Sequence, residues 1–171
     1  MRIDKLTSKL QSALADAQSL ALGKEHASIE PAHLLMALID QNRGSAFTLL
    51  SQTGFNVGEL RSQLQKVVND LPQLPDNEGE ISVSPSLGKL LNQADKLTQQ
   101  KGDSFISSET ILLIAMGDKG VVGKILNGFG VSSEALENAI VNLRGGANVS
   151  DPATEDSWQA LARFCIDLTE R

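Results

Sequence analysis

Apolar residues recur along most of the chain at three- and four-residue steps, with polar residues between them. This spacing places apolar side chains on one face of an α-helix, so each such stretch predicts an amphipathic helix that buries that face. The first stretch, residues 4 to 22, has the stripe Leu6, Leu10, Ala13, Leu14, Ala17 and Leu20. The same reasoning predicts seven more helices, over residues 31 to 39, 45 to 52, 57 to 70, 85 to 100, 108 to 116, 121 to 127 and 133 to 143.

Residues that begin or end helices flank these stretches. Pro31 and Pro85 are predicted to stand in the first turn of their helices, where the missing N–H group costs no hydrogen bond. Asp4 is expected to cap the first helix, because a short polar side chain can accept hydrogen bonds from first-turn N–H groups. Gly54 and Gly130 are expected to end the third and seventh helices.

The second half of the chain repeats the pattern of the first. The run from Ile29 to Ile39 recurs, with changes, 77 positions later as the run from Ile106 to Met116. Apolar positions upstream keep this offset, so that Leu10, Ala13, Ala17 and Leu20 fall on Leu87, Leu90, Ala94 and Leu97. We therefore expect an all-α fold, a pseudo-twofold bundle of about eight helices built from two tandem four-helix repeats.

The expected domain boundaries follow from this repeat. We expect one double-repeat domain over residues 1–146, with repeat one at 4–71 and repeat two at 84–144. Two prolines, a glycine and several acids predict that residues 72–84 form an exposed linker between the repeats. Residues 147–171 are expected to form a polar linker followed by a short helix.

Composition narrows the class of protein. Hydrophobic residues are 41% of the chain and aromatic residues only 4%, which favours an aliphatic core between helices. The net charge of −6 argues against a nucleic-acid-binding face, which needs clustered lysine and arginine. The single cysteine excludes an internal disulfide, and no apolar run approaches the ~20 residues of a membrane span. Because the N-terminus also lacks the apolar stretch of a signal peptide, we expect a cytoplasmic protein that binds neither nucleic acid nor membrane.

No set of residues predicts catalysis, a metal site or a bound cofactor. His26 is expected to be a solvated loop residue and His33 a half-buried residue with satisfied hydrogen bonds. Two histidines and one distant cysteine do not have the spacing of metal ligands, and Cys165 is expected to be a small apolar residue of a helix. A catalytic base needs a partner within hydrogen-bond reach, and the sequence offers no such pair, so an enzyme is not expected.

The seam between the two repeats is the candidate binding site. Two similar helical units with a fused core are expected to leave a groove where their first helices meet. Helical-repeat proteins commonly bind extended peptides along such surfaces. Thr7 stands at the start of one of these helices, and Leu91 and Phe105 are candidates for an apolar lining.

Three polar residues are candidates at the same place. Asp103, Glu109 and Thr110 stand around a loop and a helix start in the second repeat. An acid near a helix N-terminus is often only favourable for the helix dipole, so a structural role for Glu109 stays open. Glu109 also replaces Ala32 of the first repeat, so the second repeat has a charge where its counterpart has a methyl group.

Several runs of the sequence together resemble the Clp N-terminal repeat family. Three of them lie inside the repeats, LADAQSLALG at residues 14–23, IEPAHLL at 29–35 and GDSFISSE at 102–109. Two more, NLRGGANV at 142–149 and DLTER at 167–171, resemble the linker and the lead-in to the first ATPase module of the AAA+ disaggregases in this family. The resemblance covers the whole chain.

The resemblance implies a function and partners. The chain is expected to be the amino-terminal domain of an ATP-driven, homohexameric protein disaggregase that works with the DnaK chaperone system. It is expected to bind unfolded or aggregated polypeptides weakly in the groove and to pass them to the hexamer pore. ATP and magnesium are expected only in ATPase modules that this chain lacks, so the fragment itself is expected to be monomeric and without a cofactor.

The resemblance also implies site residues. In this family, positions matching Thr7, Asp103 and Glu109 are tied to substrate engagement. Gln93 and Thr110 stand where relatives often have leucine, which makes this groove more polar. If Thr7 and Glu109 bind peptide, alanine at either position is expected to weaken binding and to leave the melting temperature nearly unchanged.

Other functions stay open. The first alternative is an adaptor-binding N-domain of a protease-coupled Clp unfoldase, which selects a folded adaptor over unfolded chains. A purely structural spacer needs no groove, and a small helical enzyme needs a catalytic constellation that the sequence does not offer.

Overall fold

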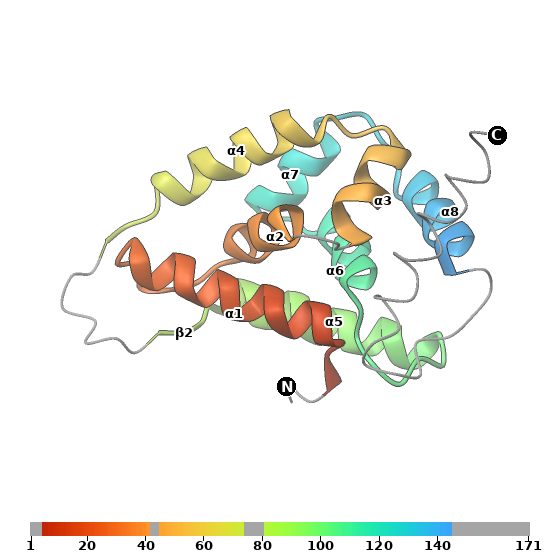
Figure 1. Cartoon of the computed structure of the whole chain (residues 1–171), viewed down its shortest axis with the longest axis horizontal. Helices are drawn as coiled ribbons and strands as arrows, with labels where there is room; N and C mark the ends of the chain where they lie inside the picture. Colours follow the sequence, from red (N-terminus) through yellow and green to blue (C-terminus); the bar gives the residue numbers. More distant parts are fainter. Residues whose placement is uncertain (1–4, 42–44, 74–80, 145–171) are drawn as a thin grey trace.

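Eight α-helices form in the part of the chain that the structure describes. This computed structural model describes residues 5–41, 45–73 and 81–144. The helices are α1 (Ser8–Gly23), α2 (Pro31–Asp40), α3 (Ser45–Thr53), α4 (Val57–Asn69), α5 (Pro85–Gln100), α6 (Ser108–Met116), α7 (Val121–Asn127) and α8 (Ser133–Arg144). The all-α class predicted from the sequence is confirmed (Figure 1). The predicted helix at the end of the chain, with Cys165, lies outside the described residues.

The start of α1 differs from the prediction. This helix begins at Ser8 rather than at residue 4, and its N-cap is Thr7, whose hydroxyl accepts a hydrogen bond from the N–H of Leu10 at 3.3 Å. The expected cap, Asp4, lies outside the described residues. The remaining helices begin and end within one residue of the predicted ranges, because proline, capping residues and glycine define their ends.

Two short backbone pairings join the repeats, and the helical periodicity did not predict them. β1 (Ser28–Ile29) pairs in parallel with β2 (Ser82–Val83). Leu6 forms a second parallel bridge with Ile106. The 77-position offset of the sequence repeat relates the two pairings, because it takes Leu6 to Val83 and Ile29 to Ile106. The same contact is therefore made twice, once on each side of the pseudo-twofold axis.

Each pairing leads directly into the N-cap of a helix. The N–H of Thr7 donates to the carbonyl oxygen of Ile106 at 2.9 Å, and the N–H of Ser84 donates to that of Ile29 at 3.0 Å. Ser84 caps α5 as Thr7 caps α1. The last residues of the predicted linker, 82–84, thus belong to a paired segment and a helix cap.

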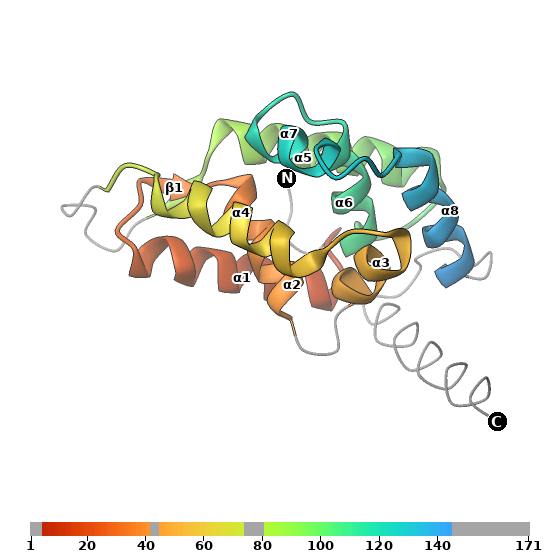
Figure 2. The same ribbon diagram turned by 90° about the horizontal axis from the view of Figure 1, so that it is seen from above.

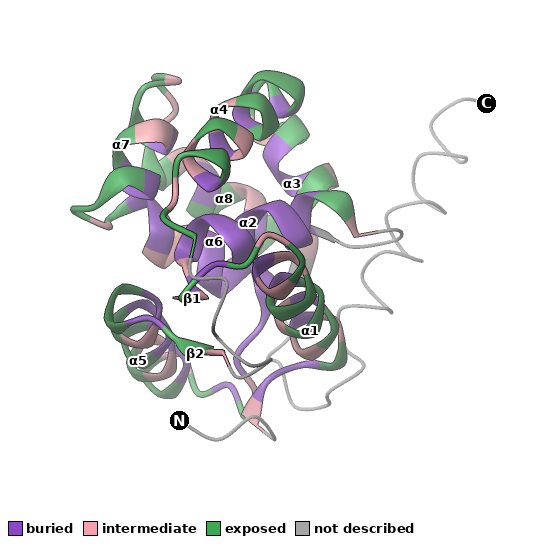
Figure 3. Cartoon of the chain, turned by 90° about the vertical axis from the view of Figure 1, so that its left-hand side faces the viewer, coloured by how far each residue is buried: buried purple, intermediate pink, exposed green. Residues whose placement is uncertain are grey.

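Helices α2 and α6 form the centre of the core. Residues Pro31 to Ile39 of α2 are all buried, and so are seven of the nine residues of α6. Helices α1 and α4 pack on α2, and α5 and α8 pack on α6. Figure 3 shows α2 and α6 as largely buried ribbons, with α1 and α5 below them on opposite sides. The core is almost entirely aliphatic, as the composition predicted.

The two repeats also interlock. α3 packs on α8 and α4 packs on α7, and Figure 2 shows α3 and α8 together at one end of the molecule. The turns after α3 and α7 use Gly54 (φ 115°) and Gly130 (φ 74°), a backbone conformation that favours glycine. Phe55, which follows Gly54, and Phe129, which precedes Gly130, meet with ring centroids 5.7 Å apart. Within the described part of the chain, no helix combines the length and apolar character that crossing a membrane requires.

Candidate functional site

The pairing of Leu6 with Ile106 determines where the candidate residues lie. Thr7 follows Leu6 and caps α1, while Phe105 precedes Ile106 on the opposite segment. Glu109 and Thr110 occupy the first turn of α6. The pairing therefore brings the start of α1 beside the segment that leads into α6.

The other two candidates come from α5 and the turn after it. Leu91 is a buried residue of α5, which packs on α6. The N–H of Asp103 donates to the carbonyl oxygen of Thr98 at 3.0 Å, which holds the turn against the end of α5. We refer to the whole set as the inter-repeat seam, made of Thr7, Leu91, Asp103, Phe105, Glu109 and Thr110.

The seam is largely closed to solvent. Thr7 and Glu109 are 0% exposed, and Thr110, Leu91 and Asp103 are also buried. Only Phe105 is half-buried. Because Thr7 caps α1 from a buried position, we expect its replacement by alanine to lower the stability of the fold. A ligand at the seam must displace or rearrange these side chains.

Polar groups at the seam bind one another and the backbone. The hydroxyls of Ser107 and Thr110 lie 3.1 Å apart, next to the start of α6. Glu109 stands in the first turn of α6, where a carboxylate is favoured by the helix dipole. Lys5 Nζ lies 4.0 Å from Asp95 Oδ1 and links the segment before α1 to α5. The seam thus combines a structural role with polar groups that a polypeptide backbone could meet.

A buried histidine pair lies elsewhere, at the start of α2. His26 is only 3% exposed, so the expectation of a solvated loop histidine is wrong. Its Nδ1 lies 2.8 Å from Nε2 of His33, and Nδ1 of His33 accepts the N–H of Glu30 at 2.8 Å. The loop turns inward because Glu25 adopts a φ of 58° and the N–H of His26 donates to the carbonyl oxygen of Ala21.

These contacts define the protonation of the pair. Because Nδ1 of His33 accepts a hydrogen bond, the neutral ring carries its proton on Nε2 and donates it to His26. Burial, and then the nearby His26 and Lys24, lower the pKa of His33 to about 4, and burial also lowers the pKa of His26. Both ring nitrogens of His33 therefore have hydrogen-bond partners, as predicted, but the side chain is fully buried rather than half-buried. No group of three or more potential metal ligands occurs among the described residues.

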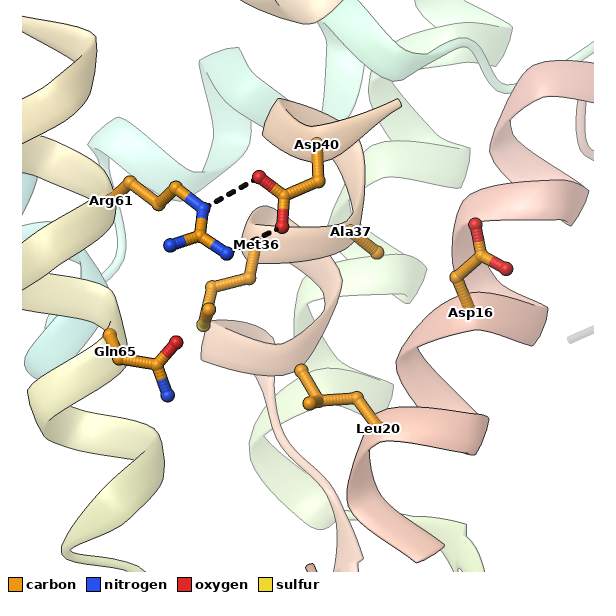
Figure 4. A pocket seen from close by; sticks show the side chains of 7 residues that line it. All are labelled: Asp16, Leu20, Met36, Ala37, Asp40, Arg61 and Gln65. Atoms are coloured by element: carbon orange, nitrogen blue, oxygen red, sulfur yellow. Dashed lines mark hydrogen bonds and ion pairs between the residues drawn. The ribbon is translucent and has the colours of Figure 1, made fainter. Parts of the chain in front are cut away.

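Repeat one also has a surface hollow that the sequence did not predict. It has a volume of about 270 Å³ and lies between α1, α2 and α4, on a part of α1 remote from the seam (Figure 4). Its lining residues are Asp16, Leu20, Met36, Ala37, Asp40, Arg61 and Gln65.

Known sequences match the chain over most of its length. Residues 5–149 match the Clp repeat (R) N-terminal domain. The chain is 55% identical over 171 residues to chaperone protein ClpB of Pseudomonas putida, covering all of this chain and 20% of that protein. The chain thus spans about one fifth of the length of this curated relative.

Solved structures share the fold. The Hsp104 N-terminal domain from Candida albicans aligns with a TM-score of 0.76 at 22% identity, over 88% of this chain and 99% of that chain. A ClpV N-domain in complex with a VipB peptide aligns with a TM-score of 0.66 at 23% identity, over 81% of this chain and 86% of that chain. At these identities the likeness shows the fold alone.

Proposed function

Since the chain belongs to the Clp repeat N-terminal domain family, we propose that it is the polypeptide-recruiting domain of an ATP-dependent protein disaggregase. The observation that carries this proposal is the 55% identity, over the whole chain, to a protein named chaperone ClpB. The matched family is an N-terminal domain, separate from the ATPase part of such proteins. In this proposal the parent is a cytoplasmic homohexamer that acts with the DnaK chaperone system.

The ligand we propose is an unfolded or aggregated polypeptide. The ClpV N-domain, which shares this fold, has been solved with a VipB peptide bound, and this supports a polypeptide ligand for the same fold here. Exposed segments of a misfolded chain offer apolar side chains together with unpaired backbone N–H groups. The inter-repeat seam could meet both, with Phe105 and Leu91 for the side chains and the carboxylates of Asp103 and Glu109 for the N–H groups.

Binding at the seam is expected to be weak. The ligand loses conformational entropy when it is ordered, and the seam has to open because five of its six residues are buried. These costs predict a Kd in the roughly micromolar to millimolar range. Six tethered copies in a hexamer raise the local concentration of sites, so the effective affinity for a polypeptide exceeds that of a single site. Weak contacts also let the polypeptide leave for the pore.

Fluorescence anisotropy tests the proposal. A permanently unfolded, non-aggregating protein and its folded form are each labelled and titrated with the chain. We expect binding of the unfolded form only, and we expect Phe105→Ala to weaken it severalfold. Phe47→Ala is the matched control, because Phe47 is an exposed phenylalanine on α3, at 49% exposure, outside the seam. Equal binding of both forms, or of neither, would contradict the proposal, and selective binding of a folded adaptor would favour the adaptor-binding alternative.

A further inference from the structure

The hollow of repeat one has an apolar floor and polar walls. Helices α1 and α4 both pack on α2, and the space between them lies over Met36 and Ala37, which are 2% and 8% exposed. Leu20 of α1 and Gln65 of α4 form opposite walls (Figure 4). A volume of about 270 Å³ is below the range of roughly 300–1,000 Å³ that is usual for small-molecule pockets. The space therefore suits one or two side chains rather than a cofactor.

Exposed hydrogen bonds flank the hollow at both ends. Nε and Nη2 of Arg61 donate to Oδ1 and Oδ2 of Asp40 at 2.6 and 2.9 Å, which joins α4 to the end of α2. At the other end, Nζ of Lys24 and Nε2 of Gln65 both donate to Oδ1 of Asn69, at 3.3 and 3.0 Å. The hollow is thus open to solvent and is flanked by exposed hydrogen bonds at the surface of repeat one.

The rim of the hollow has charged side chains on both sides. Asp40 and Arg61 neutralise each other, and the paired arginine still has N–H groups that its two bonds to Asp40 do not use. Asp16 stands on α1, across the hollow from this pair, with an exposed carboxylate (Figure 4). The rim therefore presents the carboxylate of Asp16 on one side and donors suited to a backbone carbonyl on the other.

The fold does not require this charged rim. In repeat two the positions that correspond to Asp16 and Asp40 are Gln93 and Gly117, and the position of Arg61 is Glu137. The ion pair and the facing acid are therefore absent from the second copy of the same four-helix unit. A feature that one repeat has and its structural counterpart lacks points to a role other than folding.

We propose that the hollow is a second polypeptide subsite, which takes a large aliphatic side chain from a segment that has lysine or arginine next to it. The side chain packs on Met36, whose flexible thioether adapts to different shapes, while the cation of the ligand meets Asp16. Arg61 donates to a carbonyl oxygen of the same segment. This inference shares with the proposed function only the class of ligand, because it involves none of the seam residues.

NMR titration of the isotopically labelled chain with short peptides tests the proposal. The probe is a peptide with one leucine between two lysines in a glycine–serine background. Two matched peptides have glutamate in place of the lysines or alanine in place of the leucine. We expect the lysine–leucine peptide to shift the methyl signal of Met36 and the amide signals of Asp16 and Ala37. Each matched peptide is expected to bind at least about fivefold more weakly.

A charge reversal checks the ligand chemistry without risk to the fold. Asp16→Lys changes an exposed residue and is expected to make the glutamate peptide the better ligand. Glu137→Lys is the matched control, since it makes the same change at an exposed residue of repeat two and is expected to leave both affinities unchanged. Unchanged preference in Asp16→Lys, or no shifts at the hollow with any peptide, overturns the proposal.

The peptide titrations, combined with titrations of the chain with unfolded protein, distinguish this proposal from the proposed function. Peptide shifts at the hollow, without any binding of an unfolded protein, would support the subsite and contradict polypeptide recruitment. Binding of the unfolded protein with shifts only at the seam would support recruitment and overturn the subsite.

Discussion

Mild acid should destabilise this domain through His33. The ring is fully buried, and its Nδ1 already accepts the N–H of Glu30 while its Nε2 faces His26. A second proton must go to Nδ1, where it breaks the hydrogen bond at the start of α2 and places a charge in the core. Burial, followed by the proximity of His26 and Lys24, holds the pKa of His33 at about 4, below its ordinary value of 6.5.

The size and direction of the effect follow from these two pKa values. The unfolded chain binds the proton near pH 6.5 and the folded chain only near pH 4, so His33 contributes its full stabilisation above pH 6.5. That contribution decreases as the pH falls from 6.5 to about 4 and is constant below. Because one pKa unit corresponds to about 1.4 kcal/mol, the free energy of unfolding should fall by about 2 kcal/mol at pH 5.

Urea denaturation at about pH 7.5 and about pH 5 measures this loss. His33→Gln is the control, because glutamine at this position can still accept the N–H of Glu30 but does not titrate. Apart from His33, the two proteins share every ionisable group, so the difference between their pH effects comes from His33 and its contact with His26. We expect the wild type to lose about 2 kcal/mol more than the variant. An equal loss in both proteins would refute the reasoning.

Three further predictions concern stability, each measured by thermal or urea denaturation. Thr7→Ala should cost about 1 kcal/mol and Thr7→Ser much less, because serine also caps helices; equal losses would exclude the capping role. Gly123→Ala should cost about 3 kcal/mol or more, since a Cβ would lie 1.7 Å from the carbonyl oxygen of Asp118. Gly88→Ala should stabilise by up to about 1 kcal/mol, because a Cβ there would meet Val83 Cγ1 at 4.0 Å, an ordinary contact. Arg61→Gln should cost less than about 1 kcal/mol, because its ion pair is exposed; a larger loss would assign the pair to the fold rather than to the hollow.

The helices could be predicted from the sequence because their signals are local. Pro31 and Pro85 stand at the first residue of α2 and α5, and Gly54 follows α3 with left-handed backbone. The expectation that Gly130 ends the seventh helix is wrong, because α7 ends at Asn127 with Gly128 as its C-cap, and Gly130 lies in the turn beyond. The pairing of Leu6 with Ile106 could not be predicted in this way. Two-residue strands have no periodicity, and the contact depends on how two distant segments meet.

The site was only partly predictable for the same reason. Family resemblance and the repeat predicted the seam residues, and the backbone pairing brings Thr7 beside Ile106, next to Phe105 in the sequence. The burial of Glu109 depends on the packing of α6 in the core, which its sequence neighbours do not reveal. His26 was misjudged because a polar loop usually faces solvent, whereas this loop turns back onto α2.

The most direct test of the central claim is an NMR titration of the isotopically labelled chain with a permanently unfolded, non-aggregating protein and with its folded form. The account predicts shifts from the unfolded form alone, at Thr7, Leu91, Phe105 and Glu109, in the fast exchange that weak binding produces. An absence of shifts with the unfolded form at millimolar concentration, or the same shifts with the folded form, would contradict the claim that this domain recruits unfolded polypeptide.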